Sequence, residues 1–261
     1  MLEAKTGDGA GQVSSGAGAR QPGSCDAGAK RPVLIVLHQE HSSPGAIGQW
    51  FVNNGYPIDI KRPRFGCELP ATLQEHTGAI IFGGPMSAND NDDWLRKEIG
   101  VIECCLKESA PFFGVCLGAQ LLARCLGAGV SLHPEGHVEI GYHPLTATPE
   151  GEKICAWPEY FYQWHKEGFE LPAGGRLLAT GGSAFPNQAF VYGHTAFGVQ
   201  FHSEITYTMI NRWTGRNLHK LDQKGAQKQD EQFASHMLHQ AKVRAWLDGF
   251  LGAWVKTRQP V

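Results

Sequence analysis

One stretch constrains the fold of this chain more than any other: residues 111–123, which read PFFGVCLGAQLLA. An apolar run ends in a turn of small residues with Cys116 at its tip, and a helix-forming run follows. Gly114 and Gly118 lack a Cβ, so a strand and a helix can approach each other closely around a strained turn. The stretch therefore predicts a strand–turn–helix elbow that presents the Cys116 side chain.

Strand and helix patterns alternate through the first half of the chain. The pattern predicts four strands and three helices, the strands at 33–37, 57–61, 78–82 and 112–115 and the helices at 44–54, 92–106 and 117–126. Such alternation is typical of an α/β fold, here a three-layer α/β/α arrangement around a mainly parallel central sheet.

After residue 130 the pattern changes to short strand-like segments separated by turns. We expect strands that extend the sheet in antiparallel fashion at 138–142, 177–180 and 188–192, and another strand at 195–201. Three segments follow, a short helix at 207–214, a polar loop at 217–229 and an amphipathic helix at 231–255. The last helix would cover the sheet with apolar side chains at helical spacing, namely Phe233, Met237, Val243, Leu247 and Leu251.

The composition bounds the domain organisation and excludes several classes of protein. Residues 1–30 are rich in Gly, Ala and Ser, so we expect a disordered tail there and one domain over residues 31–261, with a C-terminal helical segment. A net charge of −2 gives no electrostatic reason to bind nucleic acid or an anionic membrane. No apolar run reaches the roughly 18–20 residues of a membrane-spanning helix, and no signal-peptide core is present, which together predict a cytoplasmic protein. The seven cysteines have no regular spacing and predict free thiols.

Cys116 stands where the nucleophilic serine stands in the Gly-x-Ser-x-Gly elbow of hydrolases. At a helix N-terminus the helix dipole favours the thiolate over the thiol, which suits a nucleophile. A cysteine nucleophile also needs a base, and the base needs an acceptor that orients it. His202 and Glu204 fit these roles because they follow an apolar strand, and positions i and i+2 of a strand point to the same side. A parallel sheet gathers its strand ends along one edge, so we expect these three side chains to meet there.

A glycine-rich turn, Gly83-Gly84-Pro85, follows the predicted strand at 78–82. Its backbone N–H groups, together with the amide of Leu117, would form an oxyanion hole for an acyl-transfer intermediate.

Three motifs carry a resemblance to a known family: FGGPMS at 82–87, GVCLGAQ at 114–120 and GVQFHSE at 198–204. With them the chain resembles the class I glutamine amidotransferase domain, the type with a Cys–His–Glu triad, over about residues 33–215. Lesser matches are VEIG at 138–141 and the region of Trp164 and His165. Within the family the chain is most similar to stand-alone members like the amidotransferase domain of GMP synthase.

The resemblance implies a role for each matching residue. Cys116 would attack the γ-carboxamide of glutamine, His202 would carry the proton to the leaving amine, and Glu204 would orient His202. The N–H groups of Gly84 and Leu117 would bind the oxyanion. Gln120 would contact the bound glutamine. Water would then release glutamate, and the step requires neither a metal nor another cofactor.

The chain departs from the family pattern in its motifs and in its architecture. Ser203 replaces the proline of the usual His-Pro-Glu motif, and Leu117 stands where several relatives have tyrosine. The chain has neither room for a synthetase domain nor an ATP-binding loop. Either a separate synthetase subunit accepts the ammonia, or the enzyme hydrolyses a γ-glutamyl bond for its own sake.

Two other readings remain open, a γ-glutamyl peptidase or γ-glutamyl-amine hydrolase on the same fold, and a regulatory module without chemistry. A metal site is disfavoured, because the nearby candidates lie in strand and turn without a helical i, i+4 face; they are His133, His137, Glu139 and His143. For His165 beside Trp164, the pattern favours a packed aromatic pair over a pocket wall.

Overall fold

The computed structural model describes residues 30–258. The tail predicted at residues 1–30 therefore lies outside the described residues, except for Lys30.

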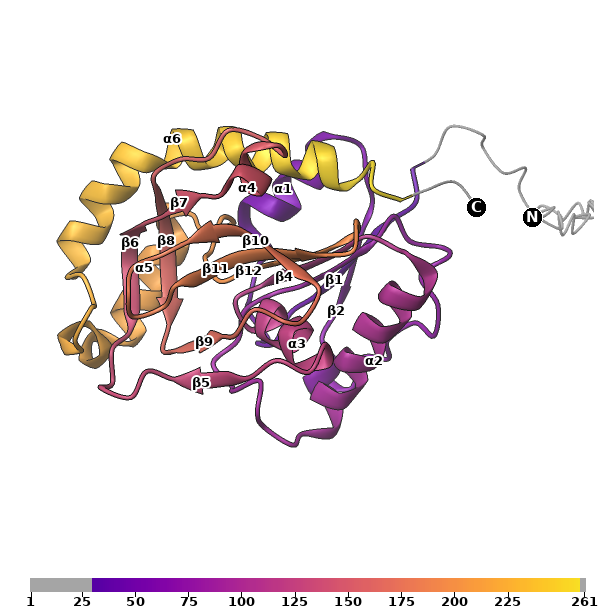
Figure 1. The fold of residues 1–261 in the computed structure, drawn as a ribbon, viewed down its shortest axis with the longest axis horizontal. Coiled ribbons are helices and arrows are strands. Elements are labelled where there is room, and N and C mark those ends of the chain that lie inside the picture. Colours follow the sequence, from indigo (N-terminus) through magenta and orange to yellow (C-terminus); the bar gives the residue numbers. More distant parts are fainter. Residues whose placement is uncertain (1–29, 259–261) are drawn as a thin grey trace, which may run out of the picture.

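Eight strands form one central sheet in the order β2-β1-β3-β4-β12-β11-β10-β7 (Figure 1). The first five in that order are parallel neighbours, and the last three extend the sheet antiparallel. The predicted α/β class is thus confirmed, and so is the antiparallel extension by the strands predicted at 177–180 and 188–192. The strands are β1 (Val33–Val36), β2 (Ile58–Lys61), β3 (Ala79–Ile81), β4 (Phe112–Val115), β7 (Thr146–Ala147), β10 (Gly175–Thr180), β11 (Asn187–Tyr192) and β12 (Ala196–Val199).

Helices cover both faces of this sheet and make the outer two layers, with α2 and α3 on one side and α1 and α6 on the other (Figure 1). The α-helices are α1 (Gly45–Asn53), α2 (Asp93–Glu108), α3 (Leu117–Cys125), α4 (Pro149–Glu152), α5 (Tyr207–Arg216) and α6 (Gln229–Trp254). Two short 3₁₀ helices, η1 (Pro63–Phe65) and η2 (Leu218–Asp222), lie in the connections.

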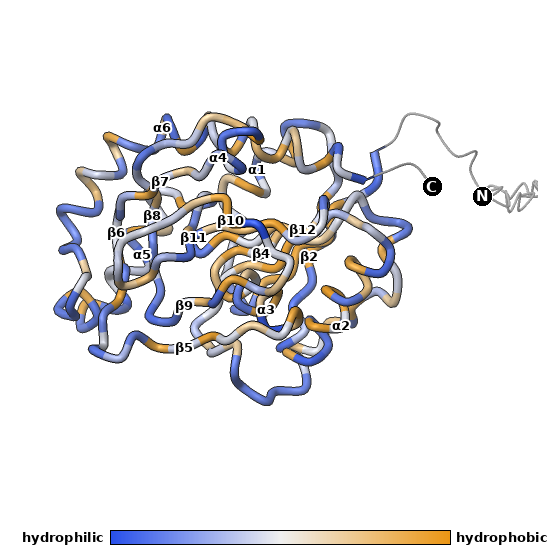
Figure 2. Tube along the Cα trace, in the orientation of Figure 1, coloured by the Kyte–Doolittle hydropathy of each residue, from blue (hydrophilic) through white to orange (hydrophobic). Residues whose placement is uncertain are grey.

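The central strands are apolar on both faces because helices pack on both. In β1, Val33 and Ile35 belong to the core under α1 and α6, whereas Leu34 and Val36 belong to the core under α2 and α3. Figure 2 shows this region as the most hydrophobic part of the chain. The continuous apolar runs that predicted these strands reflect this two-sided burial.

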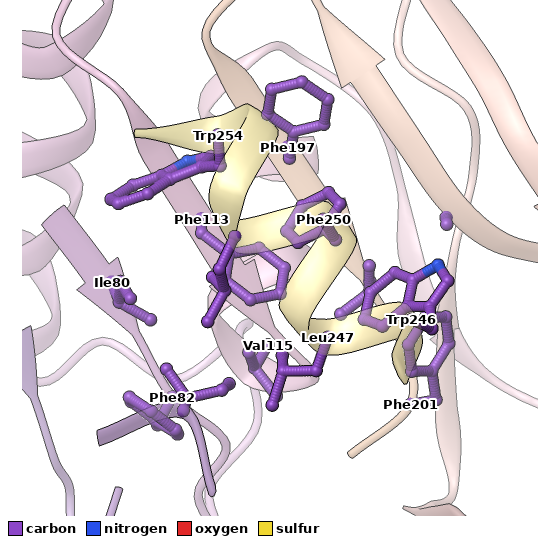
Figure 3. Close-up of a cluster of buried hydrophobic side chains, with 14 of the residues drawn as sticks. Ile80, Phe82, Phe113, Val115, Phe197, Phe201, Trp246, Leu247, Phe250 and Trp254 are labelled. Carbon is purple, nitrogen blue, oxygen red and sulfur yellow. The ribbon is translucent and has the colours of Figure 1, made fainter. Parts of the chain in front are cut away.

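Helix α6 packs its C-terminal half onto the sheet. Figure 3 shows Leu247, Phe250 and Trp254 against the side chains of β4 and β12. The ring centroids of Phe113 and Phe250 are 4.8 Å apart. Its N-terminal half extends past the sheet edge, where Met237 is 66% exposed. The expectation that Met237 helps to cover the sheet is therefore wrong, although the helix itself is confirmed.

Two pairs of strands outside the central sheet complete the domain. Strands β6 (Glu139–Pro144) and β8 (Tyr160–His165) pair antiparallel, as do β5 (Val130–Leu132) and β9 (Glu167–Phe169). Among these strands only β6 was predicted, and its expected place in the central sheet is wrong, because it pairs with β8 instead. The segment predicted as a polar loop, 217–229, instead contains η2 and the start of α6, because Leu221 is buried and anchors it.

Candidate active site

Cys116 lies at the junction of β4 and α3, where the elbow was predicted. It caps the helix with φ 51° and ψ −104°, a backbone conformation that side-chain-bearing residues rarely adopt. Gly114 and Gly118 make the turn possible, since a Cβ on Gly118 would lie 2.0 Å from the carbonyl oxygen of Ile81. The backbone thus holds the thiol at a fixed point at the end of β4.

His202 and Glu204 form a buried pair next to this junction. Nδ1 of His202 lies 2.7 Å from Oε1 of Glu204, and both side chains are less than 5% exposed. The two residues follow β12 in a turn, so the predicted reason for their shared direction, strand alternation, is wrong. Helix α6 supports the turn instead, because Arg244 donates hydrogen bonds to the carbonyls of Ser203 and Ile205.

The charge of His202 is set by its neighbours. Burial opposes a charged ring, but the Glu204 carboxylate and the Cys116 sulfur outweigh it and raise the pKa of His202 from 6.5 to about 10. Its Nε2 is buried and finds no hydrogen-bond partner among the described residues. A protonated imidazole therefore persists at neutral pH, and Nε2 is the ring nitrogen free to exchange a proton.

The turn at Gly83 and Gly84 closes the site from the end of β3. A Cβ added to Gly83 would lie 2.8 Å from Cε1 of His202 and 3.7 Å from Sγ of Cys116, so this turn and both side chains share one small space. Among the described residues, the N–H groups of Gly84 and Leu117 find no acceptor. Gly84 lines the same cavity as Cys116, and Leu117 follows Cys116 directly at the start of α3, so the two predicted oxyanion donors lie on two different elements of the site.

Two glutamines are hydrogen-bonded to each other near the thiol, with Nε2 of Gln120 3.3 Å from Oε1 of Gln200. Gln120 donates to the carbonyl of Glu167, 2.9 Å away, and Gln200 directs its amide nitrogen at Sγ of Cys116 at 3.6 Å. Gln200 was not predicted, although its position between the apolar end of β12 and His202 was a signal that it faces the site.

A cavity of about 470 Å³ contains Cys116, His202 and Glu204 in its wall. Trp164 and His165 of β8 also line it, so the favoured reading of them as only a packed pair is wrong. His165 is held by Oε2 of Glu139 at 2.9 Å and by the carbonyl of Glu167 at 3.0 Å.

The four residues weighed as metal ligands have other neighbours. Glu139 is hydrogen-bonded to His165. The rings of His133 and His137 stack with centroids 4.6 Å apart, and His143 contacts the carbonyl of Ile140. Within residues 30–258, no group of three or more His, Cys, Asp or Glu side chains is arranged to hold a metal ion.

Comparison with known proteins identifies the family. The family model for glutamine amidotransferase class-I matches residues 43–218. The chain belongs to the class I glutamine amidotransferase family. The matched region contains the elbow, the His202 turn and all six residues predicted for the site.

Individual members of the family align over most of the chain. The glutamine amidotransferase-like protein YfeJ of Salmonella typhimurium is 30% identical, over 82% of this chain and 90% of YfeJ. A glutamine-hydrolyzing GMP synthase subunit of Sulfurisphaera tokodaii is 33% identical, over 54% of this chain and 74% of its own length. A glutamine amidotransferase structure from Methylobacillus flagellatus superposes with a TM-score of 0.82 at 27% identity, covering 89% of this chain and 97% of that one.

The sequence also predicted that the chain has no membrane-spanning helix. In the described part of the chain, no helix is both long and apolar enough to span a bilayer.

Proposed function

We propose that this amidotransferase hydrolyses the γ-carboxamide of glutamine through a γ-glutamyl thioester on Cys116. The observation that carries the proposal is the buried group of Cys116, His202 and Glu204 in the wall of one cavity, with Nε2 of His202 unpartnered among the described residues. The raised pKa of His202 agrees with this role. Family membership supports the same chemistry.

The reaction has two halves. The Cys116 thiolate adds to the amide carbon, and His202 Nε2 donates its proton to the departing nitrogen, which leaves as ammonia. Neutral His202 then takes a proton from water, whose oxygen adds to the thioester. Collapse of this second intermediate releases glutamate and restores the thiolate. Glu204 holds the ring in one orientation and stabilises its positive charge throughout.

The negative oxygen of each tetrahedral intermediate needs donors. We assign this role to the N–H groups of Gly84, which lines the same cavity as Cys116, and of Leu117, which follows Cys116 in the chain; neither N–H has an acceptor among the described residues. Gln120 stands at the same wall and would contact the bound amino acid.

The test is the Cys116→Ala variant in a glutaminase assay. We expect a loss of at least about 10⁴-fold in kcat, because the nucleophile is removed while binding remains. Cys125→Ala, at the other end of the same helix, is the matched control and should keep its activity. Turnover that survives in Cys116→Ala would contradict the mechanism and favour a module in which this site does no chemistry.

The fate of the ammonia is a separate question. Two relatives of this chain are named as glutamine-hydrolyzing subunits of GMP synthase, so we propose that a separate synthetase subunit accepts the ammonia. Copurification of such a subunit, with ammonia transfer that exogenous ammonia replaces, would support this arrangement.

One observation favours a second candidate, hydrolysis of a γ-glutamyl amine whose leaving group is anionic. The cavity continues from Cys116 to α5 and η2, where Arg212, Arg216 and Lys220 line it, and no ion pair involves these cations within the described residues. Ammonia is small and needs no such wall, whereas a carboxylate on the leaving amine would pair with it.

A γ-glutamyl dipeptide and its C-terminal amide separate the two candidates. Preference for the free carboxylate by about tenfold or more in kcat/KM, which corresponds to one good charged hydrogen bond, supports the second candidate. Arg216→Gln should remove that preference and leave glutamine hydrolysis unchanged. Equal rates for the dipeptide and its amide would contradict it.

A further inference from the structure

A second buried histidine–glutamate pair lies against the Gly83–Gly84 turn, next to Gly84, whereas His202 lies next to Gly83. His38 follows β1 and Glu98 lies on α2, and Nε2 of His38 is 2.8 Å from Oε2 of Glu98. Both side chains are 0% exposed. The mechanism above uses neither residue, yet two charged or polar side chains have been buried together at this point.

The other ring nitrogen of His38 contacts the turn itself. Nδ1 lies 3.1 Å from the carbonyl oxygen of Gly83. A carbonyl oxygen only accepts hydrogen bonds, so Nδ1 must carry a proton and donate it. The Glu98 carboxyl oxygen at Nε2 requires one more proton, carried either by Nε2 or by the carboxyl group, and the hydrogen bond that results fixes the orientation of the ring.

Holding the Gly83 carbonyl also fixes the Gly84 N–H. In a trans peptide the C=O and the following N–H point in opposite directions, so one bond to the carbonyl orients the whole peptide plane. A peptide between two glycines has no side chain to fix that plane and rotates more readily than any other. His38 packs directly on it, since a Cβ on Gly84 would lie 3.1 Å from Cβ of His38.

We propose that His38 and Glu98 are positioning residues, which lock the Gly83–Gly84 peptide with the Gly84 N–H directed at the oxyanion. The inference rests on the proposed function, since it assigns a task to one of the oxyanion donors named there. It adds a buried device, contributed by β1 and α2, that neither touches the substrate nor exchanges its proton.

Two substitutions at residue 38 form the matched test. An asparagine amide nitrogen lies near the position of a histidine Nδ1 and can still donate to the Gly83 carbonyl. A glutamine amide reaches the position of Nε2 and meets Glu98 instead. We expect His38→Gln to lose about 10²–10³-fold in kcat, as when an oxyanion donor is removed, with KM nearly unchanged. His38→Asn should lose less than about tenfold.

Alkylation of Cys116 by iodoacetamide provides the readout that a general structural defect would move. The thiolate displaces iodide from a tetrahedral carbon and no oxyanion forms, so the rate at the Cys116 peptide should be the same in both variants and in the unchanged protein. A drop in kcat and alkylation together, or equal kcat in both variants, would overturn the positioning role. If the wild-type protein itself does not hydrolyse glutamine, the proposed function is contradicted and this inference with it.

Discussion

Two histidine–glutamate pairs flank the same glycine turn, and they are almost identical as pairs. His202 and Glu204 are 2.7 Å apart, His38 and Glu98 are 2.8 Å apart, and all four side chains are buried. They differ in what the second ring nitrogen faces. In His202 that nitrogen has no partner among the described residues and lies beside a thiol, whereas in His38 it is occupied by a backbone carbonyl. In the roles proposed above, the same pair of residue types moves a proton in one place and holds a peptide plane in the other.

The most direct test of this difference is to replace each of the two histidines by asparagine, in separate variants. Asparagine keeps a group near the Nδ1 position and lacks one at Nε2. At residue 202 we expect a loss of about 10⁴-fold in kcat, because the proton carrier is gone. His38→Asn, which keeps the donor to Gly83, serves as the control in the same glutaminase assay. Similar losses at the two positions would show that the pairs do not differ in role.

Removing the two carboxylates tests the same difference by pH. Glu204 is the main cause that raises the pKa of His202 to about 10, so the protonated ring persists through neutral pH and loses its proton as pH rises through that value. In Glu204→Gln the pKa falls, and the alkaline limb of kcat/KM should move to lower pH with a loss of about 10²–10⁴-fold in rate. Glu98→Gln should leave the alkaline limb in place, because the ring that Glu98 contacts, that of His38, takes no part in proton transfer. The pH–rate profiles of the two variants decide the matter.

The stability of the fold should depend on the pair that does no chemistry. His38→Leu leaves the Glu98 carboxylate buried without a partner, which is expected to lower the free energy of unfolding by about 3–5 kcal/mol. His41→Leu, in an exposed pair with Glu40, is the control and should leave the denaturation midpoint nearly unchanged. Equal denaturant midpoints for the two variants would contradict a stabilising role for the buried pair.

The smallest effect is expected at Cys116. Its positive φ strains any residue with a side chain, so Cys116→Gly should be more stable than Cys116→Ala by about 1 kcal/mol. At Cys125, in regular helix, the order should reverse, with glycine less stable than alanine by about 0.5–1 kcal/mol. Thermal denaturation of the four variants measures both differences, and the same order at both positions would rule out strain at the elbow.

What the sequence revealed about these two pairs follows from how far apart their members stand. His202 and Glu204 are neighbours in one motif, and Cys116 lies in a local strand–turn–helix pattern, so both were recognised. His38 and Glu98 are 60 positions apart on different elements. The one available signal was Glu98 itself, a carboxylate on the otherwise apolar face of α2.

The same limit explains the errors in the fold. The central strands were predicted because burial on both faces makes them continuously apolar. Strand β8 was missed because buried aromatic residues and the buried polar residue Gln163 follow one another in it, so no simple alternation of apolar and polar residues marks it. The buried face of α6 was misjudged at Met237, since helical spacing cannot tell which turns extend past the sheet.

The strained backbone at Cys116 has a consequence for how this lineage can change. A residue that destabilises its own fold is retained only while the reaction that needs it contributes to fitness. Once that reaction is dispensable, substitution of Cys116 by glycine relieves the backbone strain. The loss of the thiol then carries no disadvantage, so the substitution stabilises the fold without a functional cost. The occupant of this one position therefore reports whether a member of the family still uses its elbow.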